Sequence, residues 1–184
     1  PHPVFYDLLA GGDGMVTLDR ELKAFEREYK ALSMLNHTHI VKVGPRGKGD
    51  PVYVPLEYCG NGSAEPLIGR LNIRKAILIG VQAADALTYS HRMGVIHGDL
   101  KPSNLLFTSD GLLKVSDFGA ARIAGYTGSS SRPYTRGYGA PEQVFADIGE
   151  ICQATDVWLL SATIYTLITG RLIFHLREYE EELR

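Results

Sequence analysis

The sequence contains little cysteine and no long uninterrupted apolar run, and each shortage excludes a class of protein. Its two cysteines, Cys59 and Cys152, lie far apart and outside any CxxC spacing. This pattern predicts reduced thiols in the cytoplasm rather than a disulfide framework or a zinc site. The longest apolar run, residues 157–168, contains Ser and Thr and is too short to cross a bilayer. We therefore predict a buried helix there and no membrane partner.

Basic residues are scarce at the start, where residues 1–19 contain neither Lys nor Arg. Over all 184 residues the net charge is −2, with 45% apolar and 22% charged residues. This composition is ordinary for a globular chain with a substantial core. Because a nearly neutral chain offers no overall attraction for nucleic acid or anionic lipid, neither is an expected partner.

Polar side chains with a defined chemistry are concentrated in two short segments. Residues 96–106 contain an acid, a cation and an amide at fixed offsets, namely Asp99, Lys101 and Asn104. Thirteen residues after Asn104, Asp117 opens an Asp-Phe-Gly triplet. Phosphoryl transfer requires metal-binding oxygens, a cation and a base that orients the attacking hydroxyl group. The spacing therefore favours phosphoryl transfer over the alternative, a pair of solvated turns.

Each of these residues suits one part of that chemistry. Asp99 would orient the attacking hydroxyl group, and Lys101 would contact the transferring phosphate. Asn104 and Asp117 offer an amide oxygen and a carboxylate, which Mg²⁺ accepts as ligands beside phosphate oxygens. By contrast, residues 110–111 (Asp-Gly) lie between two β-rich segments and predict only a hairpin turn.

Together the two segments resemble the catalytic loop and the metal-binding loop of protein kinases. The resemblance implies an α+β fold with two lobes, an incomplete, β-rich N-terminal lobe (1–60) and a mainly helical C-terminal lobe (61–184). It also implies Mg²⁺-dependent transfer of phosphate from ATP to protein substrates. Thr135, which precedes an Ala-Pro-Glu anchor at 140–142, and Lys101 favour Ser or Thr over Tyr as the acceptor.

Nucleotide-binding residues outside these loops follow from the same resemblance. An amphipathic helix predicted over residues 19–35 resembles the kinase C-helix, in which Glu28 would pair with a lysine that holds the ATP phosphates. A Glu28 paired with Arg20 or with solvent is the alternative.

The segment 52–58 resembles the strand and hinge that join the two kinase lobes, with a plain hairpin strand as the alternative. The backbone of Glu57 and Cys59 would then bind adenine. Leu106 is also among the nucleotide-binding residues that the resemblance implies.

Two further helices are predicted in the second half of the chain. The first covers residues 73–93, ends at Gly94 and has these apolar positions: Ile73, Ile77, Val81, Ala84 and Leu87. The second opens at Asp156 and resembles the kinase F-helix. Asp156 would accept hydrogen bonds from the catalytic-loop backbone, act as a helix cap, or both. His97 is expected to pack against Phe118 as a structural residue.

Three departures from the kinase pattern limit the prediction. Asp7 stands where the family has the ATP-binding lysine, and residues 1–19 contain no recognisable glycine-rich loop. Gly98 stands where the family often has an arginine that pairs with a phosphorylated loop, so activity is expected not to depend on that contact. The last helices of the kinase C-terminal lobe have no counterpart after residue 174.

These departures leave two other interpretations open. The first is a pseudokinase-like module that binds ATP or protein with little turnover, because a missing charge-stabilising contact costs about 10²- to 10³-fold in rate. The second is a small-molecule phosphotransferase of the kinase-like superfamily. The Ala-Pro-Glu anchor at 140–142 and Thr135 argue against it, since the resemblance implies that they form a peptide-docking loop.

Overall fold

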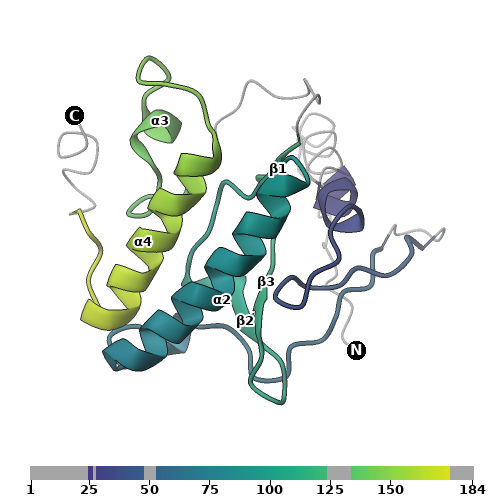
Figure 1. Cartoon of the computed structure of the whole chain (residues 1–184), viewed down its shortest axis with the longest axis horizontal. Coiled ribbons are helices and arrows are strands. Elements are labelled where there is room, and N and C mark those ends of the chain that lie inside the picture. Colours follow the sequence, from purple (N-terminus) through teal and green to yellow (C-terminus); the bar gives the residue numbers. More distant parts are fainter. Residues whose placement is uncertain (1–24, 27, 48–52, 124–133, 175–184) are drawn as a thin grey trace, which may run out of the picture.

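The computed structural model describes residues 25–26, 28–47, 53–123 and 134–174 (Figure 1). Several predictions fall outside these ranges: Asp7 at the lysine position, the glycine cluster at 11–14, the helix start at Asp19, the alternative partner Arg20, the loop 124–133 and the tail 175–184.

Three helices and two short 3₁₀ turns follow residue 60 in the described part of the chain. The long helices are α2 (Ile73–Arg92) and α4 (Gln153–Thr169), and α3 (Pro141–Val144) is a single turn. The 3₁₀ turns are Glu65–Leu67 and Pro102–Asn104. The predicted helix over 73–93 is confirmed, and Gly94 follows it with a φ of 74°. The start of α2 is capped by Asn72, whose Oδ1 accepts from Lys75 N–H at 3.0 Å.

Two antiparallel strand pairs bring the catalytic segments together. Strand β1 (Val95–Ile96) pairs with β4 (Arg122–Ile123), and β2 (Leu105–Phe107) pairs with β3 (Leu113–Val115). The second pair is the predicted hairpin, with Gly111 at φ 84° in its turn. As a result, the chain leaves the catalytic loop through β2 and returns through β3 to the Asp-Phe-Gly triplet.

The part before residue 60 contains helical residues 25–26 and 28–33 and no regular strand among the residues described. The helix ends at 33, earlier than the predicted 35, while Leu35 is still buried. Segment 53–57 runs antiparallel to 42–47 through hydrogen bonds such as Gly44 N–H to Pro55 O at 2.8 Å, with one isolated bridge at Val43 and Leu56. The predicted strand over 52–58 is therefore an irregular hairpin arm.

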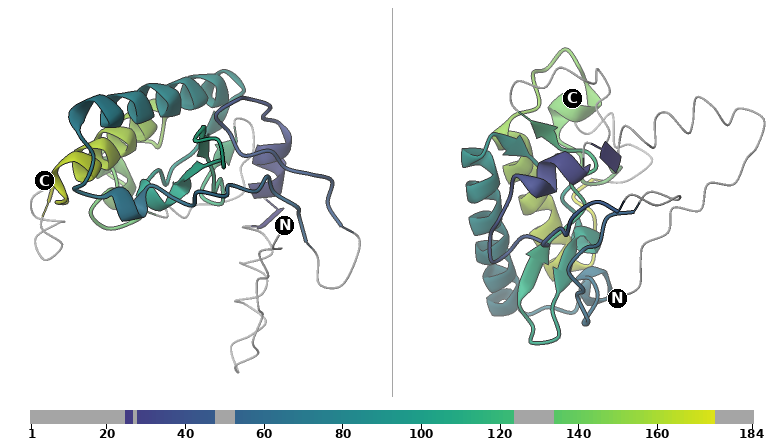
Figure 2. Two further views of the ribbon diagram at one scale, coloured as in Figure 1. Left: turned by 90° about the horizontal axis from the view of Figure 1, so that it is seen from below. Right: turned by 90° about the vertical axis from the view of Figure 1, so that its right-hand side faces the viewer.

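The core lies where α2 and α4, which run side by side, cover the two strand pairs (Figures 1 and 2). The two helices are in contact at Gly80, where a methyl group would lie 3.5 Å from the side chain of Ile164, an ordinary van der Waals distance. The largest fully buried side chains include Phe118, Leu32, Ile40, Leu100, Leu105, Leu113, Leu159 and Leu167.

The fully buried helix predicted over residues 157–168 is wrong, and the apolar positions of α2 are only partly buried. On α2, Ile73, Ile77 and Val81 are 57–61% exposed, whereas Leu87 and the neighbouring arc of Ala76, Ile79, Ala83 and Ala86 are buried. Helix α4 is buried on one face only, since Val157 is 61% exposed. In the ranges described, no helix is both long enough and apolar enough to span a membrane.

Candidate active site

Helix α4 is hydrogen-bonded to the backbone of the loop that contains Asp99. The buried carboxylate of Asp156 accepts from Gly98 N–H at 2.8 Å and from His97 N–H at 2.9 Å. The predicted contact of Asp156 with the loop backbone is thereby confirmed. His91 Nε2 lies 2.6 Å from the same carboxylate, and Thr163 of α4 donates to Leu100 O at 3.2 Å.

His97 is a packed structural residue, as the sequence predicted. Its ring is fully buried and lies 4.6 Å, centroid to centroid, from the ring of Phe118. Nδ1 accepts from Asp99 N–H at 3.2 Å, so the ring proton lies on Nε2, which donates to Ser116 O at 2.9 Å. His97 therefore connects the catalytic loop to the strand that leads to Asp117.

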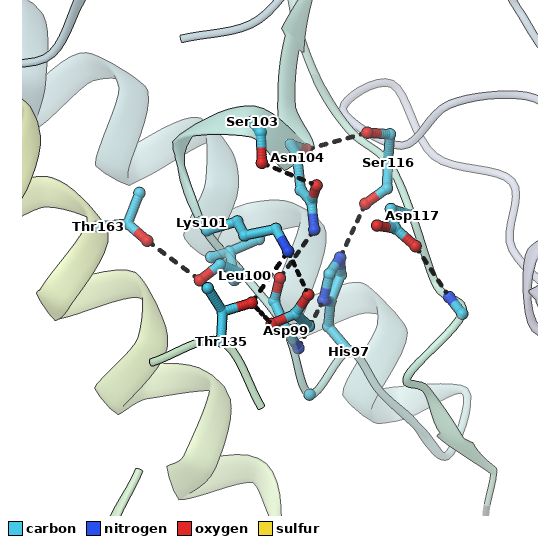
Figure 3. Close-up of polar contacts among 12 residues, drawn as sticks. His97, Asp99, Leu100, Lys101, Ser103, Asn104, Ser116, Asp117, Thr135 and Thr163 are labelled. Carbon is cyan, nitrogen blue, oxygen red and sulfur yellow. Dashed lines mark hydrogen bonds and ion pairs between the residues drawn. The ribbon is translucent and has the colours of Figure 1, made fainter. Parts of the chain in front are cut away.

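Asp99, Lys101 and Thr135 form a triangle of short polar contacts (Figure 3). Thr135 Oγ1 donates to Asp99 Oδ1 at 2.6 Å, and Lys101 Nζ donates to Asp99 Oδ2 at 2.7 Å and to Thr135 Oγ1 at 3.0 Å. All three side chains are half-buried. A hydroxyl group thus already contacts the carboxylate and the cation at this point, which demonstrates that the position can hold an alcohol.

Asn104 and Asp117 are brought together by the β2–β3 hairpin. Asn104 O accepts from Ser116 N–H at 3.0 Å and from Ser116 Oγ at 3.2 Å, so residue 104 lies directly beside the residue before Asp117 (Figure 3). Asn104 Nδ2 donates to Asp99 O at 2.8 Å, which leaves the amide oxygen with one long contact, 3.4 Å from Ser103 Oγ.

Asp117 is exposed and has a φ of 62°, a conformation that non-glycine residues adopt at a cost. Its Oδ1 accepts from Gly119 N–H at 3.3 Å, and no other hydrogen bond to a described residue engages the carboxylate. An exposed carboxylate and an amide oxygen with only one long contact among the described residues are ligand types that fit Mg²⁺.

Glu28 borders the same triplet from the helical residues 28–33. A methyl group on Gly119 would lie 4.0 Å from Glu28 Oε2 and 3.2 Å from Asp117 Oδ1, so both carboxylates flank this glycine. Burial, and secondarily the negative charge of Asp117, raise the pKa of Glu28 to about 7. No described cation pairs with Glu28, and the lysine that the resemblance implies stays a prediction.

The predicted adenine-binding residues lie on the arm that follows the irregular hairpin. Glu57 N–H donates to Lys42 O at 2.8 Å. Glu57 O accepts, among the described residues, only a weak hydrogen bond from the Cys59 thiol at 3.9 Å. The N–H of Cys59 has no hydrogen bond to any described residue. Leu106 forms an isolated β-bridge with Ser63, four residues beyond Cys59. Burial, and next the Glu57 charge, raise the pKa of the Cys59 thiol.

Lys114 is a functional candidate that the sequence did not indicate. It lies in β3 between two buried apolar residues, and only 4% of its side chain is exposed. Its Nζ lies 2.9 Å from Glu57 Oε2, which also accepts from Lys42 N–H at 3.1 Å. An ion pair therefore connects the hinge-like arm to β3, the strand that leads to Asp117. Alternation along such a short strand could not reveal that its lysine points inward.

Comparison with known proteins agrees with this site. A family model described as the protein kinase domain matches residues 15–184. The chain is 37% identical over 173 residues to the serine/threonine-protein kinase PknK of Mycobacterium bovis, covering 89% of this chain and 15% of the relative. It is 35% identical over 158 residues to the cytokinesis protein sepH of Emericella nidulans, covering 82% and 11%.

A third relative is the serine/threonine-protein kinase PknB of Mycolicibacterium smegmatis, 34% identical over 160 residues that cover 79% of this chain and 25% of the relative. The chain belongs to the protein kinase family. The predicted α+β, kinase-like fold class is confirmed with it, and the chain spans a quarter or less of these three relatives.

Proposed function

We propose that this chain transfers the terminal phosphoryl group of ATP to Ser or Thr hydroxyl groups of protein substrates. The observation that carries the proposal is the triangle of Asp99, Lys101 and Thr135, in which a threonine hydroxyl contacts both the acid and the cation. The kinase names of the relatives PknK and PknB agree with this reaction.

In the proposed reaction, the substrate hydroxyl occupies a place close to that of Thr135 Oγ1. Asp99 accepts a hydrogen bond from it, which orients the oxygen lone pair toward phosphorus and provides a place for the proton. Lys101 stabilises negative charge on the transferring group. Both groups are already directed at one point, so little reorganisation is needed during the step.

Asn104 Oδ1 and Asp117 are the residues that would hold Mg²⁺. In those positions the two oxygens would hold an ion whose charge would offset that of the phosphates. Asn104 is held for this role by its Nδ2 contact to Asp99 O, which fixes the direction of the amide oxygen relative to the base.

The adenine would be recognised by the arm at 57–59. Glu57 O and Cys59 N–H supply one acceptor and one donor, and neither has a strong partner among the described residues. Leu106 would pack against the ring. We place the boundary between the two lobes near residue 60, and the two free cysteines support the cytoplasm as the compartment.

The test is transfer of radiolabelled phosphate from ATP to a generic protein substrate with Mg²⁺. Asp99→Asn keeps the shape of the side chain and removes the base, so we expect a loss of about 10²- to 10⁴-fold in kcat. Asp110→Asn, in the exposed hairpin turn, is the matched control and keeps full activity. Equal activity of the Asp99→Asn variant and the wild type would contradict the assignment.

The pseudokinase-like alternative predicts a different result in the same samples. ATP would raise the melting temperature while neither protein transfers phosphate, because a ligand that binds only the native state stabilises it. This outcome would support a module that binds ATP with little turnover.

A further inference from the structure

Gln143 contacts the peptide group that carries Asp99, although it lies far from it in the sequence. It is the third residue of α3 and is 3% exposed. Its Oε1 accepts from Ala140 N–H at 3.0 Å, and its Nε2 donates to Gly98 O at 2.7 Å. One amide side chain therefore bridges the end of the segment that contains Thr135 and the backbone of the catalytic loop.

The simplest role for Gln143 is a helix cap. A Gln or Glu at the third helical position commonly accepts from the N–H of the capping residue, as Gln143 does from Ala140. That role uses only the side-chain oxygen, and a carboxylate would serve it at least as well near a helix N-terminus. The bond to Gly98 O requires an N–H donor, which glutamine has and ionised glutamate lacks.

The bond to Gly98 O involves a peptide group that is hydrogen-bonded at both its oxygen and its N–H. Gly98 O and Asp99 N–H belong to one peptide plane, with Gln143 bound to the oxygen and His97 Nδ1 bound to the N–H at 3.2 Å. The preceding plane is held by Asp156, which accepts from Gly98 N–H at 2.8 Å. Gly98 itself has a φ of 78° and no side chain, so its orientation depends on contacts of its backbone such as these.

We propose that Gln143 is a positioning residue that orients the peptide plane leading into Asp99 and couples it to the segment that presents Thr135. It touches neither substrate nor nucleotide. Without the Nε2 contact, Gly98 O becomes a buried acceptor that lacks this donor, and the plane turns to find another. Because the nitrogen of Asp99 belongs to this plane, the Asp99 side chain then moves away from Thr135 and Lys101.

The decisive variant is Gln143→Glu. We expect kcat to fall about 10- to 100-fold at pH 8, as for misplacement of a reacting group by about 1 Å, while KM for ATP stays within about 2-fold of wild type. Lowering the pH should restore activity relative to wild type, because a protonated glutamate regains a donor and burial favours the neutral form. Gln143→Ala should lose activity at every pH.

Gln153→Glu is the matched control, since it introduces the same charge at the exposed first residue of α4. It should leave kcat and its pH profile unchanged. If Gln143→Glu keeps wild-type kcat from pH 6 to 8.5, Gln143 is only a cap and the inference is wrong.

The role of Gln143 in turnover rests on the proposed kinase activity, so a second measurement tests the inference without turnover. Amide-resolved hydrogen exchange by NMR needs no turnover. In Gln143→Glu, Ala140 N–H should remain protected because the carboxylate still accepts, while exchange at Asp99 N–H should accelerate at least 10-fold. Unchanged exchange at Asp99 would overturn the proposal, and absence of phosphate transfer by the wild type would overturn only the proposed function.

Discussion

The ion pair between Lys114 and Glu57 leads to an asymmetric prediction, because its two partners are buried to different degrees. Only 4% of the Lys114 side chain is exposed, against 25% for Glu57. Glu57→Gln leaves a buried ammonium group without its counter-charge. Removing one partner of a buried pair typically costs about 3 to 5 kcal/mol, and the amide oxygen of glutamine can still accept from Lys114 and Lys42. We therefore expect a loss near the lower limit, about 3 kcal/mol.

Lys114→Met should cost much less, about 1 kcal/mol or below. Methionine replaces the buried charge with an apolar side chain of similar length, and replacing a buried ionic group in this way is often nearly neutral. Glu57 keeps its bond from Lys42 N–H and its partial contact with water. The double variant, Glu57→Gln with Lys114→Met, should be no less stable than Lys114→Met alone. The buried ammonium group that Glu57→Gln leaves without a counter-charge is absent from it.

Urea unfolding followed by circular dichroism measures all three variants. Glu26→Gln is the control, because it breaks the exposed pair between Glu26 and Arg46, in which the atoms are 3.8 Å apart, and should cost less than about 1 kcal/mol. The reasoning is refuted if Lys114→Met costs as much as Glu57→Gln, or if Glu57→Gln costs no more than Glu26→Gln.

Two further predictions concern pH and backbone strain. Because the pKa of Glu28 is raised from 4.5 to about 7, the native state retains a proton that the unfolded chain loses, and stability should fall as the pH rises from about 4.5 to 7. The fall in the free energy of unfolding is on the order of 3 kcal/mol. Urea unfolding at pH 5 and pH 8 measures it, and Glu28→Gln should abolish it. An equal fall in the variant and the wild type would contradict the assignment. Gly98→Ala should cost more stability than Gly111→Ala. Both glycines have a positive φ, which costs a non-glycine residue about 1 to 2 kcal/mol. In addition, a methyl group on Gly98 would lie 3.1 Å from Ala120 O, whereas one on Gly111 meets nothing within 4 Å. Equal losses in thermal unfolding would show that this contact relaxes without cost.

Features set by neighbouring residues could be predicted from the sequence. The loop 96–106 and the β2–β3 hairpin are local, so the order of Asp99, Lys101 and Asn104 was sufficient to indicate their chemistry. Helix α2 was likewise predictable in extent, because its apolar positions repeat at helical spacing and Gly94 marks its end. Its buried face was not predictable, since two arcs of α2 are apolar and only packing against α4 and the strands chooses between them.

Contacts between distant segments could not be predicted in the same way. Lys114 is one residue of a short strand, and its ion pair exists only because β3 passes beside the arm at 57–59. Gln143 could be recognised as a helix-capping residue, but its second bond depends on the position of Gly98, 45 residues earlier.

The sequence by itself indicated the family and predicted the catalytic side chains, because their spacing within one loop limits which functional groups can meet a phosphate. The tertiary structure decided how these groups are held. Asp156 of α4 and Gln143 of α3 converge on the backbone of residues 97–99, and His97 adds a local contact within the loop. Directional bonds to a backbone depend on how elements pack in space, and a linear order of residues does not contain that information.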